Sequence, residues 1–226
     1  MRESQSLPIP QRVLLLTSIG EEASRVRAYC GELFDDVQWH SGNWGDPTPD
    51  DFRTWNGDLV VSYCSRWIVP SALLENTGRA INFHPAPPTR RGAGGINWAL
   101  YENAVEYGVT CHEIDAQLDA GPILEVRRFP VLDTDDVCAL YARTHGHLEE
   151  MARRILKRIA MGESIAPSGE QWSGVVRTRA ELDQLSTLSA DMDLEEMSRR
   201  IRATSFGSWQ PVLSLHEWRF VLSDGQ

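Results

Sequence analysis

The sequence predicts an α/β fold in which helices cover a mostly parallel sheet. Short apolar runs typical of buried strands alternate along the chain with stretches whose apolar residues recur at helical spacing. Gly, Pro, Asn and Asp separate these stretches, as they do at turns. Because strands that alternate with helices are typical of parallel sheets, residues 11–165 predict one layered domain.

The first part of the chain predicts an arm, three strands and one helix. Residues 1–10 contain two prolines and indicate a flexible arm. Residues 12–17 and 58–63 are apolar runs of the kind found in strands buried on both faces, and 37–40 is a further candidate strand. Apolar residues at helical spacing over 21–33 predict a helix between the first two strands.

The middle of the chain predicts the rest of this domain. A short helix over 71–76 precedes a strand over 80–83, which runs into a polar, Pro-rich loop. A helix over 95–102 follows the loop. Asp133 and Thr134 form an N-cap signal for a long amphipathic helix over 134–162. The two further strands expected here span 107–114 and 123–131.

The composition changes after Ile165, where Pro167 and Gly169 interrupt any regular pattern. We therefore expect a catalytic domain over residues 11–165 and a small C-terminal α+β subdomain over 171–226. Within the subdomain, the pattern predicts a helix over 194–203 and then one or two strands, with 220–222 as the strand segment.

Charge and composition narrow the class of partner. The chain has 22 basic and 32 acidic residues, a net charge of −10, which disfavours nucleic acid and anionic membranes as partners. No apolar run is long enough to span a membrane, and residues 1–10 lack the apolar core of a signal peptide, so we expect a cytoplasmic protein. Four widely spaced cysteines without a C-x-x-C pair predict buried thiols and no metal site.

Residues able to carry chemistry concentrate between 80 and 125. Asn82 and His84 stand at the end of a predicted strand, and Asp119 follows another strand, so the three side chains can meet at one sheet edge. An Asn amide donates to an oxygen that becomes negative, a His moves protons, and an Asp orients the imidazole. No Ser or Cys is placed as a nucleophile, which favours direct transfer to an amine. The structural alternative is a strand-end cap followed by a turn.

The motifs in this stretch resemble those of the folate-dependent formyltransferases. They are Asn82-x-His84-Pro85, a glycine-bearing loop over 90–95, Gly108-Val109-Thr110 and Leu118-Asp119-x-Gly121-Pro122, in this order and spacing. The resemblance covers residues 11–165 and implies a doubly wound, Rossmann-like core. It also implies that Asn82, His84 and Asp119 are catalytic and that N10-formyltetrahydrofolate is the formyl donor.

Two further segments resemble those that line the pterin pocket in this family. One follows the strand over 58–63, and the other follows the strand that carries Thr110. The resemblance implies folate contacts from Arg66, Trp67, Ile68, Val69, Ile114, Asp115, Ala116 and Gln117.

The acceptor amine is less constrained. Relatives that formylate initiator methionyl-tRNA have a larger, basic C-terminal barrel, which a short tail and a charge of −10 do not match. Glu21 and Glu22 follow the first strand where the glycinamide ribonucleotide enzymes hold a phosphate, and they would repel it. Formyltetrahydrofolate hydrolases carry an additional N-terminal module that we do not find.

The tail contains Arg177-Thr-Arg-Ala-Glu-Leu-Asp183, then Arg199-Arg-Ile-Arg-Ala203 and Phe206, and a last strand, Trp218-Arg-Phe-Val221. In these segments it resembles the tail of the nucleotide-sugar N-formyltransferases. The acceptor that we expect is therefore a dTDP- or GDP-linked amino sugar of polysaccharide biosynthesis, and we expect a homodimer. The alternatives are another small amine, such as hydroxyornithine in siderophore or antibiotic biosynthesis, and a regulator that binds folate or nucleotide without turnover.

Candidate acceptor contacts lie in the glycine-bearing loop and the helix after it. Guanidinium groups suit diphosphate oxygens, and an indole suits a sugar or base, although a solvated loop and core packing are the structural alternatives. The residues are Arg90, Arg91, Gly94 and Trp98. We interpret His112 as a structural histidine and expect His145 and His147 at the surface.

Overall fold

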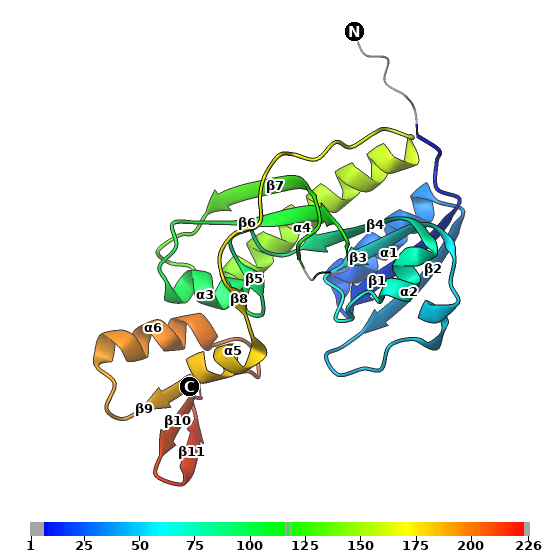
Figure 1. The fold of residues 1–226 in the computed structure, drawn as a ribbon. Coiled ribbons are helices and arrows are strands. Elements are labelled where there is room, and N and C mark those ends of the chain that lie inside the picture. Colours follow the sequence, from blue (N-terminus) through cyan, green and yellow to red (C-terminus); the bar gives the residue numbers. More distant parts are fainter. Residues whose placement is uncertain (1–6, 116, 118, 224–226) are drawn as a thin grey trace.

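A six-stranded sheet forms the centre of the computed structural model, which describes residues 7–115, 117 and 119–223 (Figure 1). Its strand order is β2-β1-β3-β4-β6-β7. The first four strands in this order are parallel, and β6 and β7 are antiparallel to their neighbours. The sheet is therefore mostly parallel, as predicted. Its strands are β1 (Arg12–Ser18), β2 (Asp36–Gly42), β3 (Gly57–Tyr63), β4 (Thr77–His84), β6 (Glu106–Glu113) and β7 (Ile123–Pro130).

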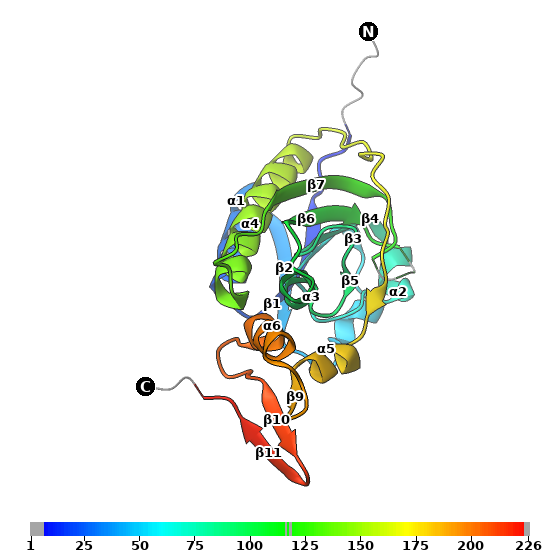
Figure 2. The ribbon, with the colours of Figure 1, turned by 90° about the vertical axis from the view of Figure 1, so that its left-hand side faces the viewer.

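Helices cover both faces of this sheet (Figure 2). One face carries α1 (Glu21–Leu33) and α4 (Val137–Ala160), and the other carries α2 (Ser71–Glu75) with the 3₁₀ turn η1 (Asp50–Arg53). Alternate residues of β1 serve the two layers. Val13 and Leu15 pack in the cluster that includes α1 and α4, whereas Leu14 and Leu16 pack with Phe52 and Leu73. The apolar run of β1 is thus explained by burial on both faces.

The predicted start of the long helix is wrong by about one turn. α4 begins at Val137, and its cap is Asp136, whose side chain accepts a hydrogen bond from the Ala139 amide at 2.7 Å. Asp135 is unavailable as a cap because its carboxylate binds the Arg143 guanidinium, at 2.6 and 2.8 Å. A run of adjacent Asp residues offers several caps, and this tertiary ion pair selects among them.

The C-terminal part adds a second, three-stranded sheet of order β11-β10-β9, which projects from the main body (Figure 1). The predicted helix is α6 (Leu194–Thr204), which packs on α3 (Gly95–Tyr101) and accepts a hydrogen bond from Asn97 Nδ2 at the Ala203 carbonyl, 2.7 Å away. The predicted last strand is β11 (Trp218–Val221). The sequence patterns did not predict β5 (Arg91–Gly92), β8 (Val176–Arg177), α5 (Arg179–Leu185), β9 (Thr187–Ser189) and β10 (Val212–Leu215).

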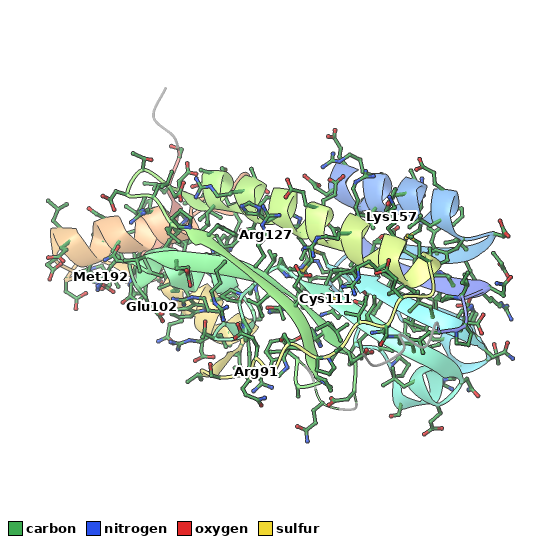
Figure 3. All side chains as sticks on the ribbon, turned by 90° about the horizontal axis from the view of Figure 1, so that it is seen from above. Arg91, Glu102, Cys111, Arg127, Lys157 and Met192 are labelled. Carbon is green, nitrogen blue, oxygen red and sulfur yellow. The ribbon has the colours of Figure 1, made fainter. Side chains whose placement is uncertain are left out.

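The structure also tests the predictions about which cysteines are buried and whether a helix could span a membrane. Cys30 and Cys111 are buried as predicted, but Cys138 is exposed. Figure 3 shows Cys111 within the molecule and Lys157, the only lysine, on the exposed side of α4. Along the part of the chain that the structure describes, no helix is long and apolar enough to cross a membrane. The expected homodimer stays a prediction.

Candidate active site

Two of the predicted catalytic residues occupy the end of β4. Asn82 and His84 are two positions apart on this strand, so their side chains lie on the same face of the sheet. β4 is the last parallel strand, and β6 runs antiparallel beside it with Asn82 opposite His112 and His84 opposite Thr110. The site therefore forms where the sheet changes direction.

Asp119 reaches the same place from the turn between β6 and β7. Its Oδ1 atom lies 3.8 Å from His84 Nδ1 and 3.7 Å from His112 Nε2, and its side chain is only 8% exposed. The backbone of Asp119 has a φ of 46°, a left-handed conformation that Asp tolerates better than most residues. The three residues predicted from the sequence thus meet in the structure.

Gly121 makes this turn possible. A Cβ atom at position 121 would lie 2.0 Å from the Glu113 carbonyl oxygen, a separation that no side chain tolerates. The Leu-Asp-x-Gly motif therefore has a steric reason in the close approach of the turn to the end of β6.

His112 belongs to the site, although we interpreted it from the sequence as structural. Its Nδ1 lies 2.8 Å from the Glu113 carbonyl, which can only accept, so Nδ1 carries the proton. Nε2 is then an acceptor, and Asn82 Nδ2 donates to it at 3.0 Å. Burial lowers the pKa of His112 to about 4, which keeps this imidazole neutral. His112 consequently fixes the orientation of the Asn82 amide, whose second N–H can serve another acceptor.

His84 lies between two acceptors. Its Nε2 donates to the Arg90 carbonyl at 3.3 Å, and its Nδ1 faces the Asp119 carboxylate. Each ring nitrogen of His84 therefore lies near an oxygen that can accept an N–H.

Trp172 is a component of the site that sequence reasoning missed. It lies in the segment between α4 and β8, and its ring centroid is 4.8 Å from that of His112 and 6.0 Å from that of His84. Its Nε1 donates to the Gly121 carbonyl at 2.7 Å. No local pattern marks this tryptophan, since it is more than 50 positions from the residues it contacts.

The two segments assigned to the pterin pocket meet on the α2 side of the sheet. Trp67, Val69 and Ile114 are partly buried against one apolar cluster. The Trp67 indole also donates to the carbonyls of Asp46 and Pro47, at 3.2 and 3.1 Å. Of the other residues assigned here, Ile68 is 72% exposed, Arg66 lies over the Trp44 ring, Asp115 accepts from the Gln117 amide, and Ala116 lies outside the described residues.

The candidate acceptor residues divide into two groups. Arg90, Arg91 and Trp98 line a hollow of about 190 Å³ together with Glu102 and Arg177. Arg91 and Glu102 are labelled in Figure 3. The Glu102 carboxylate binds Arg90 at 2.8 Å and Arg177 at 3.4 Å, so two guanidinium groups share this carboxylate.

Packing against α5 explains why position 94 is a glycine and why most of the Trp98 side chain is buried. Gly94 has a φ of 75°, and a Cβ there would lie 2.8 Å from Leu182 of α5. Trp98 is 8% exposed and packs against Leu182 and Leu185. The structure thus favours the packing alternative for Trp98, although its ring also borders the hollow.

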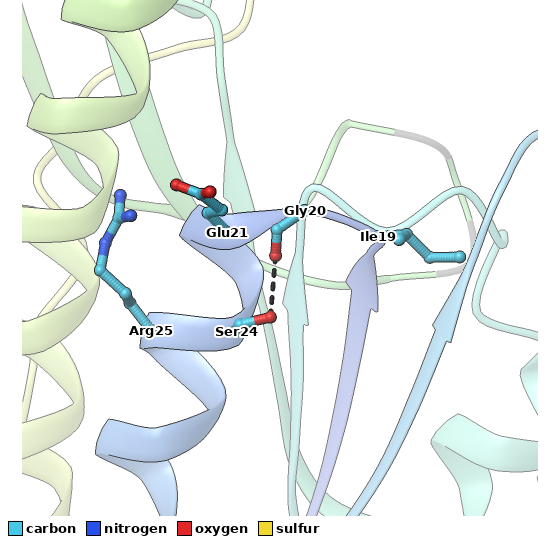
Figure 4. Close-up of a pocket in the computed structure, with 5 residues that line it drawn as sticks. All are labelled: Ile19, Gly20, Glu21, Ser24 and Arg25. Atoms are coloured by element: carbon cyan, nitrogen blue, oxygen red, sulfur yellow. Dashed lines mark hydrogen bonds between the residues drawn. The ribbon is translucent and has the colours of Figure 1, made fainter.

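A second hollow, of about 580 Å³, opens at the end of β1 (Figure 4). Ile19, Glu21 and Arg25 line it, and Ser24 Oγ donates to the Gly20 carbonyl at 2.9 Å. Arg25 is bound to Glu149 at 2.8 Å, so the carboxylate of Glu21 is not offset by a free cation there. This hollow is poorly suited to a phosphate.

His145 and His147 have different surroundings from those expected. His145 is 7% exposed and stacks on Tyr141 with ring centroids 4.0 Å apart, so the surface prediction is wrong for it. His147 is half-buried and packs on Phe129. His145 thus packs on a residue of its own helix, whereas His147 packs on a residue of β7.

The sequence profile described as formyl transferase matches residues 46–156, almost half of the chain. This segment contains Asn82, His84, His112 and Asp119. Residues 46–156 match a formyl transferase domain. The resemblance inferred from the motifs is therefore confirmed, and the site lies within the formyl transferase domain.

Curated relatives match this domain over part of their length. The hydrogenase maturation factor HoxX of Bradyrhizobium diazoefficiens is 31% identical over 53% of this chain and 21% of its own length. The methionyl-tRNA formyltransferase of a Janthinobacterium species is 30% identical over 65% of this chain and 46% of its own. The chain thus spans less than half the length of either relative.

Solved structures match almost the whole chain. A sugar N-formyltransferase from a Shewanella species superposes with a TM-score of 0.75 at 19% identity, covering 93% of this chain and 96% of the other. An N-formyltransferase from Helicobacter canadensis, solved with folinic acid and dTDP-3-aminofucose, superposes with a TM-score of 0.71 at 19% identity, covering 92% and 85%. At these identities the similarity establishes the fold, including the C-terminal part.

Proposed function

We propose that this protein transfers a formyl group from N10-formyltetrahydrofolate to the amine of a nucleotide-linked amino sugar. The observation that carries the proposal is the meeting of Asn82, His84 and Asp119 at the end of β4, within a formyl transferase domain. This arrangement offers an amide donor, a proton carrier and a carboxylate around one point.

Each residue has a role that its contacts support. The Asn82 amide, oriented by neutral His112, donates to the formyl oxygen as it gains negative charge. Protonated His84 donates to the same oxygen or to the departing nitrogen of the donor, and Asp119 stabilises the imidazolium. Asp119 also accepts a proton from the attacking amine, directly or through His84.

The folate donor fits the α2 side of the site. Val69 and Ile114 provide partly buried apolar surface there, and Asp115 and Gln117 are exposed near Ile114. An apolar wall beside polar groups suits a flat heterocycle such as a pterin. We therefore propose that these segments hold the donor, as the family resemblance implies. The Helicobacter canadensis protein, solved with folinic acid, has the same fold.

For the acceptor, we propose that Arg90 and Arg91 bind the diphosphate of the nucleotide. They border a hollow whose cations outnumber its carboxylate, and the Arg90 carbonyl contacts His84. The larger hollow at Glu21 lacks such an excess of cations. The Helicobacter canadensis protein was solved with a dTDP-linked amino sugar, which supports this class of acceptor.

The test incubates the purified protein with N10-formyltetrahydrofolate and a panel of dTDP- and GDP-linked amino sugars. Mass spectrometry then measures each acceptor for the mass of an added formyl group. We expect formylation of a nucleotide-linked sugar and none of the same sugar without its nucleotide. Formylation of hydroxyornithine alone would replace the acceptor class, and donor binding without any transfer would contradict the proposed activity.

A further inference from the structure

The segment between α4 and β8 crosses the candidate active site and is attached on both sides of it. Near its start, the Ser168 amide and hydroxyl both donate to the Ile123 carbonyl of β7, at 2.8 and 3.0 Å. Near its end, the Ser173 amide donates to the Pro88 carbonyl at 3.1 Å, and β8 pairs with β5. We call residues 166–175 the crossing segment.

Trp172 is the side chain through which the crossing segment reaches the catalytic groups. Its indole ring is perpendicular to the His112 ring, with an interplanar angle of 90°, and inclined at 71° to the His84 ring. The Arg91 guanidinium also lies 5.9 Å from the ring centroid of Trp172. The indole therefore lies close to both histidines and to this arginine.

The indole N–H has a separate effect on the site. It donates to the Gly121 carbonyl at 2.7 Å, and Gly121 lies two residues after Asp119 in the same turn. The Trp172 hydrogen bond therefore anchors the turn that carries Asp119 to the crossing segment.

We infer that Trp172 is a positioning residue of this site: its ring keeps water from the two histidines, and its N–H fixes the turn that carries Asp119. Trp172 acts through His112, His84 and Asp119. Loss of the ring would hydrate His112 and free the Asp119 turn to move. The inference deepens the proposed function. Its turnover measurements rest on that function, whereas its histidine titration does not.

The charged groups around His112 set the direction of the expected change. Asp119 faces its Nε2 at 3.7 Å, His84 lies at a ring distance of 6.4 Å, and Asp115 acts from the following loop. The two carboxylates raise the pKa of His112 and His84 lowers it, but burial is the largest cause of its low pKa. Removing the Trp172 cover weakens that largest cause, so we expect the pKa of His112 to rise.

The experiment titrates the full-length protein with ¹⁵N-labelled histidine by NMR and assigns His112 with the His112→Gln variant. In Trp172→Ala we expect the pKa of His112 to rise by about one unit or more, and in Trp172→Phe, which keeps an aromatic cover, by less. Two controls change other contacts. Trp218→Ala removes an exposed indole on β11, and Ser168→Ala loosens the crossing segment without removing the Trp172 ring.

Turnover provides the second measurement. We expect Trp172→Ala to lower kcat about 100-fold and to leave KM for the folate donor within about threefold, because misplaced catalytic groups slow the chemical step. The acid limb of the kcat–pH profile should shift to higher pH together with the pKa of His112. We expect both controls to resemble the wild type.

The inference is overturned if Trp172→Ala and the control Trp218→Ala have the same pKa of His112 and the same kcat–pH profile. It is also overturned if Ser168→Ala moves both as far, because loosening of the segment alone would then explain the effect. Should Trp172→Ala fail to fold, Trp172→Phe decides. This variant keeps an aromatic ring but lacks the N–H to Gly121, so it should fold and lower kcat about tenfold. Absence of turnover in the wild type refutes the proposed function, and the titration alone then decides the role of Trp172.

Discussion

Asn82→Ala tests the central assignment, because the amide has one structural and one catalytic contact that can be measured separately. In the structure, Nδ2 donates to His112 Nε2 at 3.0 Å. Alanine leaves this buried acceptor without its donor, which costs about 1–3 kcal/mol of stability. For a protein of this size, each kcal/mol lowers the melting temperature by about 2–4 °C.

The catalytic effect of Asn82→Ala should be larger. Removal of one donor to a developing oxyanion lowers kcat by about 10²–10³, which corresponds to about 2.7–4 kcal/mol of transition-state stabilisation. Mass spectrometry of the formylated acceptor measures the rate, and circular dichroism measures the melting temperature of the same preparation. A variant that melts lower but turns over within threefold of the wild type would refute the catalytic role and leave Asn82 as a partner of His112.

Three further predictions concern the same site. Asp119→Asn should fold, because Asn also tolerates a left-handed backbone. It should lose turnover but still bind the folate donor, which calorimetry measures. Loss of folding would instead mark Asp119 as structural. Gly121→Ala should destabilise the protein by about 1–3 kcal/mol and lower kcat, because its Cβ would meet the Glu113 carbonyl. An unchanged melting temperature would contradict this close approach of the turn to Glu113. The free energy of unfolding should fall as the pH drops from about 6.5 to about 4, because the unfolded His112 imidazole binds a proton that the folded one excludes. Denaturant titrations should give a shallower pH dependence for His112→Gln than for the wild type. An identical pH dependence would show that His112 is not responsible.

The elements themselves were largely predictable, because their signals are local. The helix predicted over 21–33 has those bounds in the structure, since its apolar spacing depends only on the turn of a helix. The start of α4 was not predictable. Three neighbouring Asp residues are equivalent as caps, and the ion pair of Asp135 with Arg143 decides which of them is free.

The C-terminal part was the least predictable. Its strands are short, and β9 pairs with β10 across the whole of α6, so no single window of sequence contains the pair. One signal was available. Thr178 and Glu181 form a capping box at the start of α5, and this motif can be read from the residues alone.

By itself, the sequence determined that Asn82 and His84 share a face, because residues two apart on a strand always do. The order and spacing of the motifs also predicted the resemblance to the formyltransferases, and residues 46–156 match a formyl transferase domain. Only the tertiary structure decided that His112 faces Asn82, because the register of β6 against β4 depends on long-range pairing. The same holds for Trp172, whose contacts with His84, His112 and Gly121 join segments that lie at least 50 residues apart.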